Sequence, residues 1–199
     1  MIEVKNIYKS FNKTEVLNKI DTIFYRGKTN LIIGQSGSGK TVLLKCLLGL
    51  YEVDLGEILY DGISSKNMGI NEKLEISRQM GMVFQGSALF DSMNVLENVR
   101  FPLDMLTEID ENEKNERALK FIERVNLKDA IEKLPSELSG GMQKRVAIAR
   151  AIVMNPKYLF CDEPNSGLDP KTAIVIDKLI QEITKEYNIT TIINSHDMN

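Results

Sequence analysis

Cysteine is scarce in this chain, which has only two among its 199 residues, Cys46 and Cys161. They do not have the spacing of cysteine pairs that bind zinc or iron–sulfur clusters, so they indicate no metal site. Each lies within an apolar run, and such positions favour buried, unreactive thiols. We therefore expect two reduced cysteines in the protein interior, which fits the reducing cytosol.

Long apolar segments and an excess of basic residues are lacking too. No stretch approaches the roughly 20 apolar residues of a transmembrane helix, and residues 1–11 contain no signal-peptide core. If the protein works at a membrane, a partner must therefore span it. The net charge of −3 also differs from the basic excess of proteins that coat nucleic acid, so we expect no nucleic-acid partner.

What the chain does contain is the composition of one globular domain, with 43% hydrophobic and 27% charged residues. Apolar, β-branched patterns predict strands within residues 2–25, 29–33, 58–60, 82–84, 158–161 and 189–194. Helical periodicity is found within residues 40–50, 92–153 and 172–187. Strands that alternate with helices in both flanks, around a helical block, predict an α/β core with a parallel sheet.

A glycine-rich turn follows the strand at 29–33 and leads into the next helix. Its residues fit the pattern GxxxxGK[ST], and they are Gly34, Gln35, Ser36, Gly37, Ser38, Gly39, Lys40 and Thr41. Backbone N–H groups of such a loop surround phosphate oxygens, aided by the positive end of the helix dipole. We expect Lys40 to reach the β- and γ-phosphates and Thr41 to bind Mg²⁺. The alternative is a flexible turn, which the strand–helix context disfavours.

An acidic pair, Asp162 and Glu163, ends the apolar strand at 158–161. Ligands of parallel sheets lie at the carboxyl ends of the strands, so both side chains should meet the phosphates. Asp162 suits the Mg²⁺ shell, and Glu163 suits the polarisation of an attacking water, as a general base or a water orienter. Taken alone, the pair would also fit the cap of a helix.

A second glycine turn, Ser139-Gly140-Gly141, precedes another predicted helix. It is a second potential anion site at a helix N-terminus, although by itself it would equally fit a serine-capped helix start. One small domain has little use for two phosphate sites around one nucleotide. We therefore interpret the second turn as a site for the nucleotide of another copy of the chain.

The motifs GQSGSGKT, LSGGM, LFCDEP, SGLD and a late His-Asp, in this order, resemble the nucleotide-binding subunits of ABC transporters over essentially the whole chain. The resemblance implies a subunit that binds and hydrolyses Mg-ATP as a head-to-tail dimer and drives a membrane permease from the cytoplasmic face. It also implies a P-loop core at 29–50, 80–86 and 155–199, an antiparallel β subdomain at 1–30 and 51–62, and a helical subdomain at 87–154.

The same resemblance assigns roles to further residues. Gln85 matches the glutamine that senses Mg²⁺ and the attacking water, and His196 matches the switch histidine that contacts the γ-phosphate. Phe11 matches the aromatic residue that stacks on adenine, with Val16 beside it. The signature turn 139–141 would contact the γ-phosphate held by the opposite subunit. Structural explanations stay open for three of these residues. Phe11 would also fit the core, His196 a structural position and Gln85 a loop.

A finer resemblance concerns residues 84–99 together with LSGGM, which are similar to ATPases of the maintenance-of-lipid-asymmetry system. Those act with a permease and a lipid-binding protein of the mammalian-cell-entry (MCE) type, so lipid transport and an MCE-type partner are expected. Leu89, Phe90 and Met93 would form a groove for a permease helix, or pack internally. Family members usually continue well past the switch histidine, so we expect a truncated chain whose end frays near His196.

Two other functions fit parts of the pattern. A soluble ABC ATPase of translation or DNA repair usually has two such domains or long insertions, which this sequence does not show. A regulatory module that binds ATP without hydrolysing it would have no need of Glu163 and His196.

Overall fold

Two four-stranded sheets organise the chain in the computed structural model, which describes residues 1–195. The antiparallel sheet has the order β2-β1-β4-β5 and comprises β1 (Ile2–Phe11), β2 (Thr14–Phe24), β4 (Leu55–Tyr60) and β5 (Ile63–Ser64). The parallel sheet has the order β3-β8-β7-β6 and comprises β3 (Thr29–Ile33), β8 (Thr190–Ser195), β7 (Tyr158–Asp162) and β6 (Met80–Val83). The predicted α/β class, with a parallel core and an N-terminal antiparallel sheet, is confirmed.

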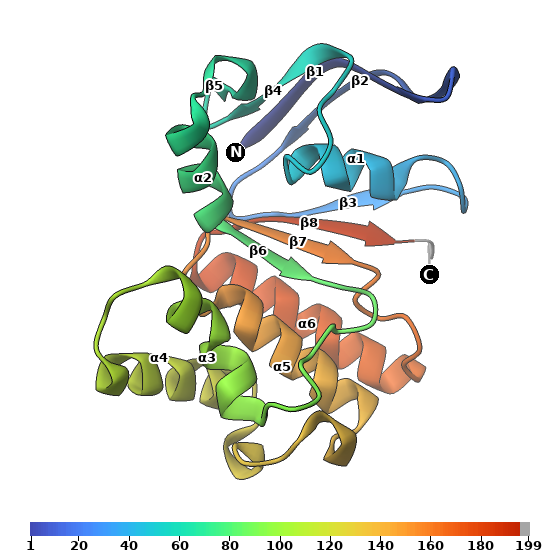
Figure 1. Ribbon diagram of the computed structural model, residues 1–199. Helices are drawn as coiled ribbons and strands as arrows, with labels where there is room; N and C mark the ends of the chain where they lie inside the picture. The colour runs from blue at the N-terminus through green and yellow to red at the C-terminus, as the bar shows by residue number, and fades with distance from the viewer. Residues whose placement is uncertain (196–199) are drawn as a thin grey trace.

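The helices form layers around the parallel sheet. They are α1 (Lys40–Leu47), α2 (Ile70–Arg78), α3 (Val95–Leu106), α4 (Glu111–Arg124), α5 (Gly140–Ile152) and α6 (Pro170–Glu186), with short 3₁₀ turns at Ser65–Asn67, Lys128–Ala130 and Pro135–Glu137. Figure 1 shows α1 between the two sheets, α5 and α6 beneath the parallel sheet, and α3 and α4 further below. Among the described residues, no helix is both long enough and apolar enough to cross a bilayer.

Alternate residues of the parallel strands face opposite layers, because side chains of a strand have a period of two. In β7, Tyr158 and Phe160 pack in the cluster that contains α1, whereas Leu159 and Cys161 pack in the cluster that contains α5 and α6. Continuation of this alternation places Asp162, at the end of β7, on the α1 side of the sheet. The sheet register thus directs a carboxylate toward the start of the helix that follows the glycine-rich loop.

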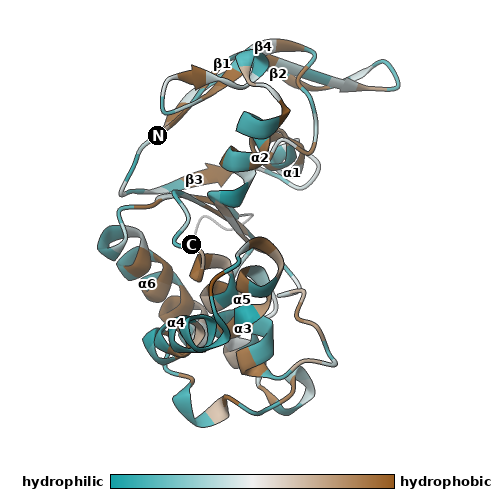
Figure 2. Ribbon diagram, turned by 60° about the vertical axis from the view of Figure 1, so that its left-hand side comes forward, coloured by the Kyte–Doolittle hydropathy of each residue, from teal (hydrophilic) through white to brown (hydrophobic). Residues whose placement is uncertain are grey.

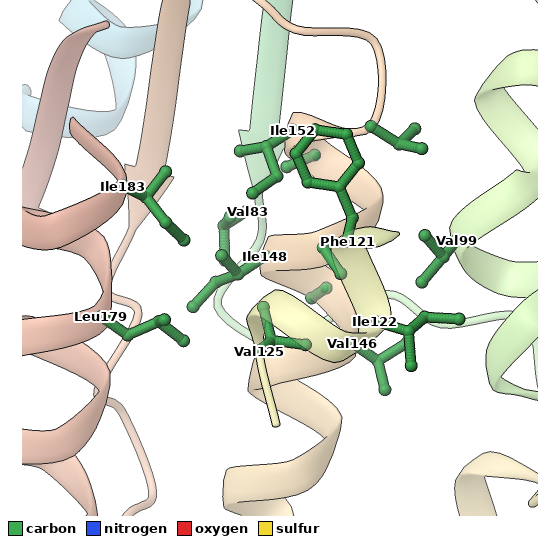
Figure 3. Close-up of a cluster of buried hydrophobic side chains, with 14 of the residues drawn as sticks. Val83, Val99, Phe121, Ile122, Val125, Val146, Ile148, Ile152, Leu179 and Ile183 are labelled. Atoms are coloured by element: carbon green, nitrogen blue, oxygen red, sulfur yellow. The ribbon is translucent and has the colours of Figure 1, made fainter. Parts of the chain in front are cut away.

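The core on the other side of the sheet confirms the amphipathic stripe expected in the helical block. Phe121, Ile122 and Val125 lie with Val146 and Ile148 of α5 in a single buried cluster (Figure 3). Burial of each such large side chain contributes about 1.5–3 kcal/mol to folding. The opposite face of α4 is charged and exposed, and its ribbon is mostly teal in Figure 2.

Residues 63–79 form structure that the sequence did not reveal. They contain the short strand β5 and the helix α2, which has no fully buried residue and packs against the core only through the partly buried Ile76. Helix α1 also ends at Leu47, three residues before the expected Leu50, because the chain turns at Gly49 with φ of 72°.

Candidate functional site

The carboxyl ends of the parallel strands meet at one edge of the sheet, as expected for a ligand site. Strand β3 leads into the glycine-rich loop that starts at Gly34, and β7 ends at Asp162, directly before Glu163. Strand β8 lies between them and pairs in parallel with both. Residues that are more than 100 positions apart in the sequence are thereby neighbours in the structure.

The glycine-rich loop depends on glycine at two places. Gly37 and Gly39 have φ of 78° and 92°, a region that residues with a side chain rarely adopt. A Cβ on Gly39 would also lie 3.0 Å from the backbone oxygen and 3.2 Å from Cγ1 of Val16. Val16, on β2, therefore contacts the loop directly, while Gln35 and Ser36 of the loop are exposed.

Lys40 is the first residue of α1, and only 6% of it is exposed. Its Nζ donates hydrogen bonds to the backbone oxygens of Gly34, at 2.6 Å, and Gln35, at 2.9 Å. The backbone N–H of Ser38 donates to the same Gln35 oxygen at 3.2 Å. The ammonium group therefore lies within the curl of the loop, where a phosphate group would meet it.

Thr41 and Asp162 are brought together by Asn194 of β8. The Asn194 Nδ2 donates to Asp162 Oδ1 at 2.6 Å and lies 3.5 Å from Thr41 Oγ1. A hydroxyl and a carboxylate are hard oxygen ligands of the kind that Mg²⁺ takes beside phosphate oxygens and water. These residues therefore fit a Mg²⁺ ion that is bound together with a nucleotide. Within residues 1–195, no group of three or more His, Cys, Asp or Glu side chains could hold a metal by itself.

Gln85 and Glu163 form a second pair beside the first. The Gln85 Nε2 donates to Glu163 Oε2 at 2.9 Å and to Ser166 Oγ at 3.1 Å. Glu163 adopts a φ of 47°, and its N–H donates to the Asn194 backbone oxygen at 2.9 Å. A left-handed conformation in a residue with a side chain is strained and typical of functional positions. The amide of Gln85 thus holds the carboxylate proposed to orient water.

A buried lysine contacts the backbone of Gln85. The Nζ of Lys144, on α5, donates a hydrogen bond to the backbone oxygen of Gln85. Only 4% of Lys144 is exposed. Burial lowers the pKa of its ammonium group, although the neighbouring Cys161 and Glu163 oppose that effect.

The second glycine turn begins α5 with Ser139 as its N-cap, whose Oγ accepts a hydrogen bond from Met142 N at 3.3 Å. A Cβ on Gly141 would lie 2.6 Å from Thr172 Cγ2, so this glycine lets the turn pack against the start of α6. Figure 1 shows the helical layer with α5 below the parallel sheet, whereas the loop before α1 lies above it. The two glycine turns thus belong to different layers of the chain.

Phe11 lies at the end of β1 and is 38% exposed. Its ring meets Tyr51 edge-on, with centroids 5.3 Å apart, and Lys9 Nζ lies 5.3 Å from the ring centre. Tyr51 and Lys9 therefore both contact a ring that is partly exposed, and its stacking on adenine stays a prediction.

Comparison with known proteins adds an independent observation. Residues 17–166 match the family model described as ABC transporter. The chain belongs to the ABC transporter family. The chain therefore has the ABC ATPase fold, and its family binds ATP with Mg²⁺.

Similar ABC proteins have been named for several cargoes. Over 198 residues the chain is 41% identical to the methionine import ATP-binding protein MetN of Clostridium tetani, covering all of this chain and 62% of MetN. It is 38% identical to the probable ribonucleotide transport ATP-binding protein mkl of Mycobacterium leprae, covering 57% of that protein. It is 39% identical to the glutamine transport ATP-binding protein GlnQ of Escherichia coli, covering 82% of GlnQ. The chain thus spans about three-fifths of the length of MetN and mkl.

Solved ABC structures share the fold. The structure of cbiO1 from Clostridium perfringens, part of the ABC transporter complex cbiONQ, is 32% identical with a TM-score of 0.91, covering 98% of this chain and 78% of cbiO1. The dimeric structure of the bacterial ABC transporter cassette MJ0796 is 32% identical with a TM-score of 0.86, covering all of this chain and 89% of MJ0796.

The structure places the residues of the predicted ABC site in different ways. The structure brings Lys40, Thr41, Asp162, Glu163 and Gln85 to one edge, with Val16 against the loop, but Gln85 contacts Glu163 and not the Thr41–Asp162 pair. The signature turn lies apart from them, and His196 lies outside the described residues. Sequence reasoning missed Asn194, Lys144 and Tyr51. An amide that interrupts the apolar run before the late His-Asp was the available signal for Asn194.

Proposed function

We propose that this ABC cassette binds and hydrolyses Mg-ATP in a head-to-tail dimer with a second copy and thereby drives a membrane permease from its cytoplasmic face. The observation that carries the proposal is the contact of Gln85 with Glu163 at the strand ends where Thr41 and Asp162 also meet. A carboxylate held by an amide beside a phosphate loop is suited to orient water for phosphoryl transfer.

Each part of the site has a role in this proposal. Backbone N–H groups of the loop from Gly34 to Gly39, with Lys40, bind the phosphates, and Thr41 and Asp162 hold Mg²⁺, which neutralises phosphate charge. Phe11 stacks on adenine with Val16 beside it, and Gln85 senses the metal through its position next to Glu163. His196 completes the site as the residue that contacts the γ-phosphate.

The dimer follows from the second glycine turn. The first N–H groups of a helix have no intrahelical acceptor, and the Ser139 side chain takes up only that of Met142. The N–H groups of Gly140 and Gly141 are therefore the ones that a phosphate of the opposite subunit would take up. The similar cassette MJ0796 is dimeric in two structures, one of which is bound to ADP and Pi.

A groove beside Gln85 supports a permease as partner. Its volume is about 430 Å³, and it is lined by residues of α2, β6, α3 and α5 and of the loop between β6 and α3. Phe84 and Phe90 of that loop and Phe101 of α3 are among them. An apolar groove of this kind suits one face of an amphipathic helix. Of the three residues expected to form the groove, only Phe90 lines it. Leu89 instead packs against the buried core.

The cargo is a separate proposal, because an ATPase cassette does not touch it. The resemblance of residues 84–99 and LSGGM to lipid-transport ATPases supports lipid transport with an MCE-type partner. The names of similar proteins, which mention methionine, glutamine and ribonucleotides, favour transport of small polar solutes as the second candidate. Identification of the membrane and solute-binding proteins that co-purify with the chain distinguishes the two.

The Glu163→Gln variant tests hydrolysis and dimerisation together. It keeps the hydrogen-bonding shape but removes the carboxylate, so we expect it to bind ATP, to lose most phosphate release and to accumulate as an ATP-bound dimer on size-exclusion chromatography. Lys40→Ala is the matched variant, and we expect it to lose nucleotide binding itself. Hydrolysis at the wild-type rate by Glu163→Gln would contradict the proposed role of Glu163.

A further inference from the structure

Asn194 is a fully buried amide in β8, where it follows the apolar residues Ile192 and Ile193. Both neighbouring strands pair with β8, so the sheet accounts for the backbone and the side chain needs a separate explanation. Burial of an amide is unfavourable unless its polar atoms are hydrogen-bonded. The strand register places Asn194 opposite Asp162, at the sheet edge where the glycine-rich loop begins.

Asn194 contacts both members of the acidic pair. Its side-chain Nδ2 donates to Asp162 Oδ1 at 2.6 Å, and its backbone oxygen accepts from the N–H of Glu163 at 2.9 Å. The same Nδ2 lies 3.5 Å from Thr41 Oγ1. One residue therefore positions the carboxylate that fits Mg²⁺ and the backbone that carries Glu163, and it lies beside the Thr41 hydroxyl.

The side-chain oxygen of Asn194 has no hydrogen-bond donor among the described residues. Asn194 Oδ1 is buried and accepts no hydrogen bond within the described part of the chain. The orientation of the amide is fixed, because an ionised carboxylate only accepts hydrogen bonds and the NH₂ group must face Asp162. The missing partner is therefore a donor. Mg²⁺ keeps several of its water molecules when proteins bind it, and each of these waters is a donor.

We infer that Asn194 is a positioning residue of the Mg²⁺ site, which orients Asp162 through Nδ2 and accepts a hydrogen bond from a metal-bound water through Oδ1. This inference rests on the proposed Mg-ATP site. Partners of this kind, one step removed from the metal, tune the affinity of the site for the ion. The competing explanation is a purely structural amide, whose Oδ1 is satisfied by an ordered water whether or not the metal is bound.

The Asn194→Leu variant separates the two explanations, because leucine has a similar size and no polar atom. The readout is the Mg²⁺ concentration that gives half of the metal-dependent gain in affinity for a non-hydrolysable ATP analogue, measured by calorimetry. We expect this concentration to rise about 10- to 100-fold, while affinity for the analogue in EDTA stays unchanged. Thr190→Val is the matched control, since Thr190 is buried with an unpartnered hydroxyl at the opposite end of β8. We expect it to keep the wild-type Mg²⁺ dependence.

A folded Asn194→Leu variant with wild-type Mg²⁺ dependence would overturn the inference and leave the proposed function intact. If the variant does not fold, a high-resolution structure of the wild-type chain with Mg²⁺ and the analogue decides. A metal-bound water within hydrogen-bond distance of Oδ1 supports the inference, and any other partner of Oδ1 overturns it. Wild-type protein without Mg²⁺-dependent binding of the analogue would overturn the proposed function, and this inference with it.

Discussion

The ammonium group of Lys144, on the helix that begins with the signature turn, donates a hydrogen bond to the backbone oxygen of Gln85. The side chain of Gln85 in turn contacts Glu163. Two hydrogen bonds therefore connect α5 to the carboxylate that we propose to orient water. If the signature turn binds the nucleotide of a second copy, this connection lets one site affect the geometry of the other.

Replacement of Lys144 by methionine removes this connection and keeps most of the length of the side chain. Hydrogen bonds to charged groups contribute about 1.5–3 kcal/mol, which corresponds to roughly 10- to 100-fold in rate. We expect kcat for ATP hydrolysis to fall by about tenfold while affinity for ATP stays unchanged. Methionine relieves the burial of a charge but leaves the Gln85 backbone oxygen without its donor, so we expect only a small change in the melting temperature.

Arg145→Met is the matched control for Lys144→Met. The Arg145 guanidinium, on the same helix, donates to the backbone oxygens of Val125 and Asn126, at the end of α4, and not to Gln85. Its loss should therefore affect stability more than kcat. Equal kcat values for wild type and Lys144→Met, or parallel losses of activity and stability, would show that Lys144 has no positioning role.

The sequence predicted the parts of the site that are local in the chain. The loop 34–41 and the pair Asp162–Glu163 follow apolar strands directly, so residue type and order suffice to place them at the sheet edge. The contact of Gln85 with Glu163 joins residues 78 positions apart, and only the family resemblance connected them. Helix α2 was not predicted because its three apolar residues, Ile70, Leu74 and Ile76, do not fall on one face of a helix.

The two thiols should be unreactive in the folded protein. Burial raises the pKa of Cys46 to about 11 and that of Cys161 further, and both cysteines are buried and free. A thiol with this pKa has on the order of 0.1% thiolate at pH 8, and the thiolate is the reactive form. We expect Ellman's reagent to label neither thiol in the native state at pH 8 and both in urea. Fast labelling of the native chain would contradict the burial of both residues.

The raised thiol pKa values also give stability a pH dependence with a definite sign. The folded state prefers the protonated thiols, so this contribution is fully present below the unfolded-state value of 9.0 and decreases as pH rises toward about 11. We expect the free energy of unfolding in urea to fall between these two pH values. Cys46→Ala should reduce the decrease of the unfolding free energy with pH. A decrease identical to that of wild type would contradict the contribution of Cys46.

Phe84→Ser tests the groove beside Gln85. Phe84 lines the groove and is 47% exposed, so the substitution removes apolar contact area without opening a cavity in the core. We expect weaker association with the permease and less hydrolysis in the assembled complex, with ATP affinity unchanged. Leu55→Ser, at an exposed position of β4 on the antiparallel sheet, is the control. Wild-type recovery of the permease by Phe84→Ser would place the docking surface elsewhere.

Gly141→Ala tests the signature turn through a single steric contact. The added Cβ would lie 2.6 Å from Thr172 Cγ2, which is closer than real Cβ atoms approach, so the Thr172 side chain or one of the helices α5 and α6 must shift. Overpacking of this kind costs about 1–3 kcal/mol. We expect lower stability. When Gly141→Ala is added to the Glu163→Gln variant, we also expect weaker ATP-dependent dimerisation, because the turn moves.

The second substitution Thr172→Ser decides whether this contact is the cause. Serine lacks the Cγ2 methyl group but keeps the hydroxyl that donates to Asp169 Oδ2 at 2.5 Å, so the cap of α6 is retained. We expect Gly141→Ala combined with Thr172→Ser to recover most of the stability and dimerisation, measured by urea unfolding and analytical ultracentrifugation. If the double variant recovers stability but not dimerisation, the alanine itself interferes with the opposite subunit, which would still place Gly141 at the dimer contact. If it recovers neither, the 2.6 Å contact is not what requires glycine at this position.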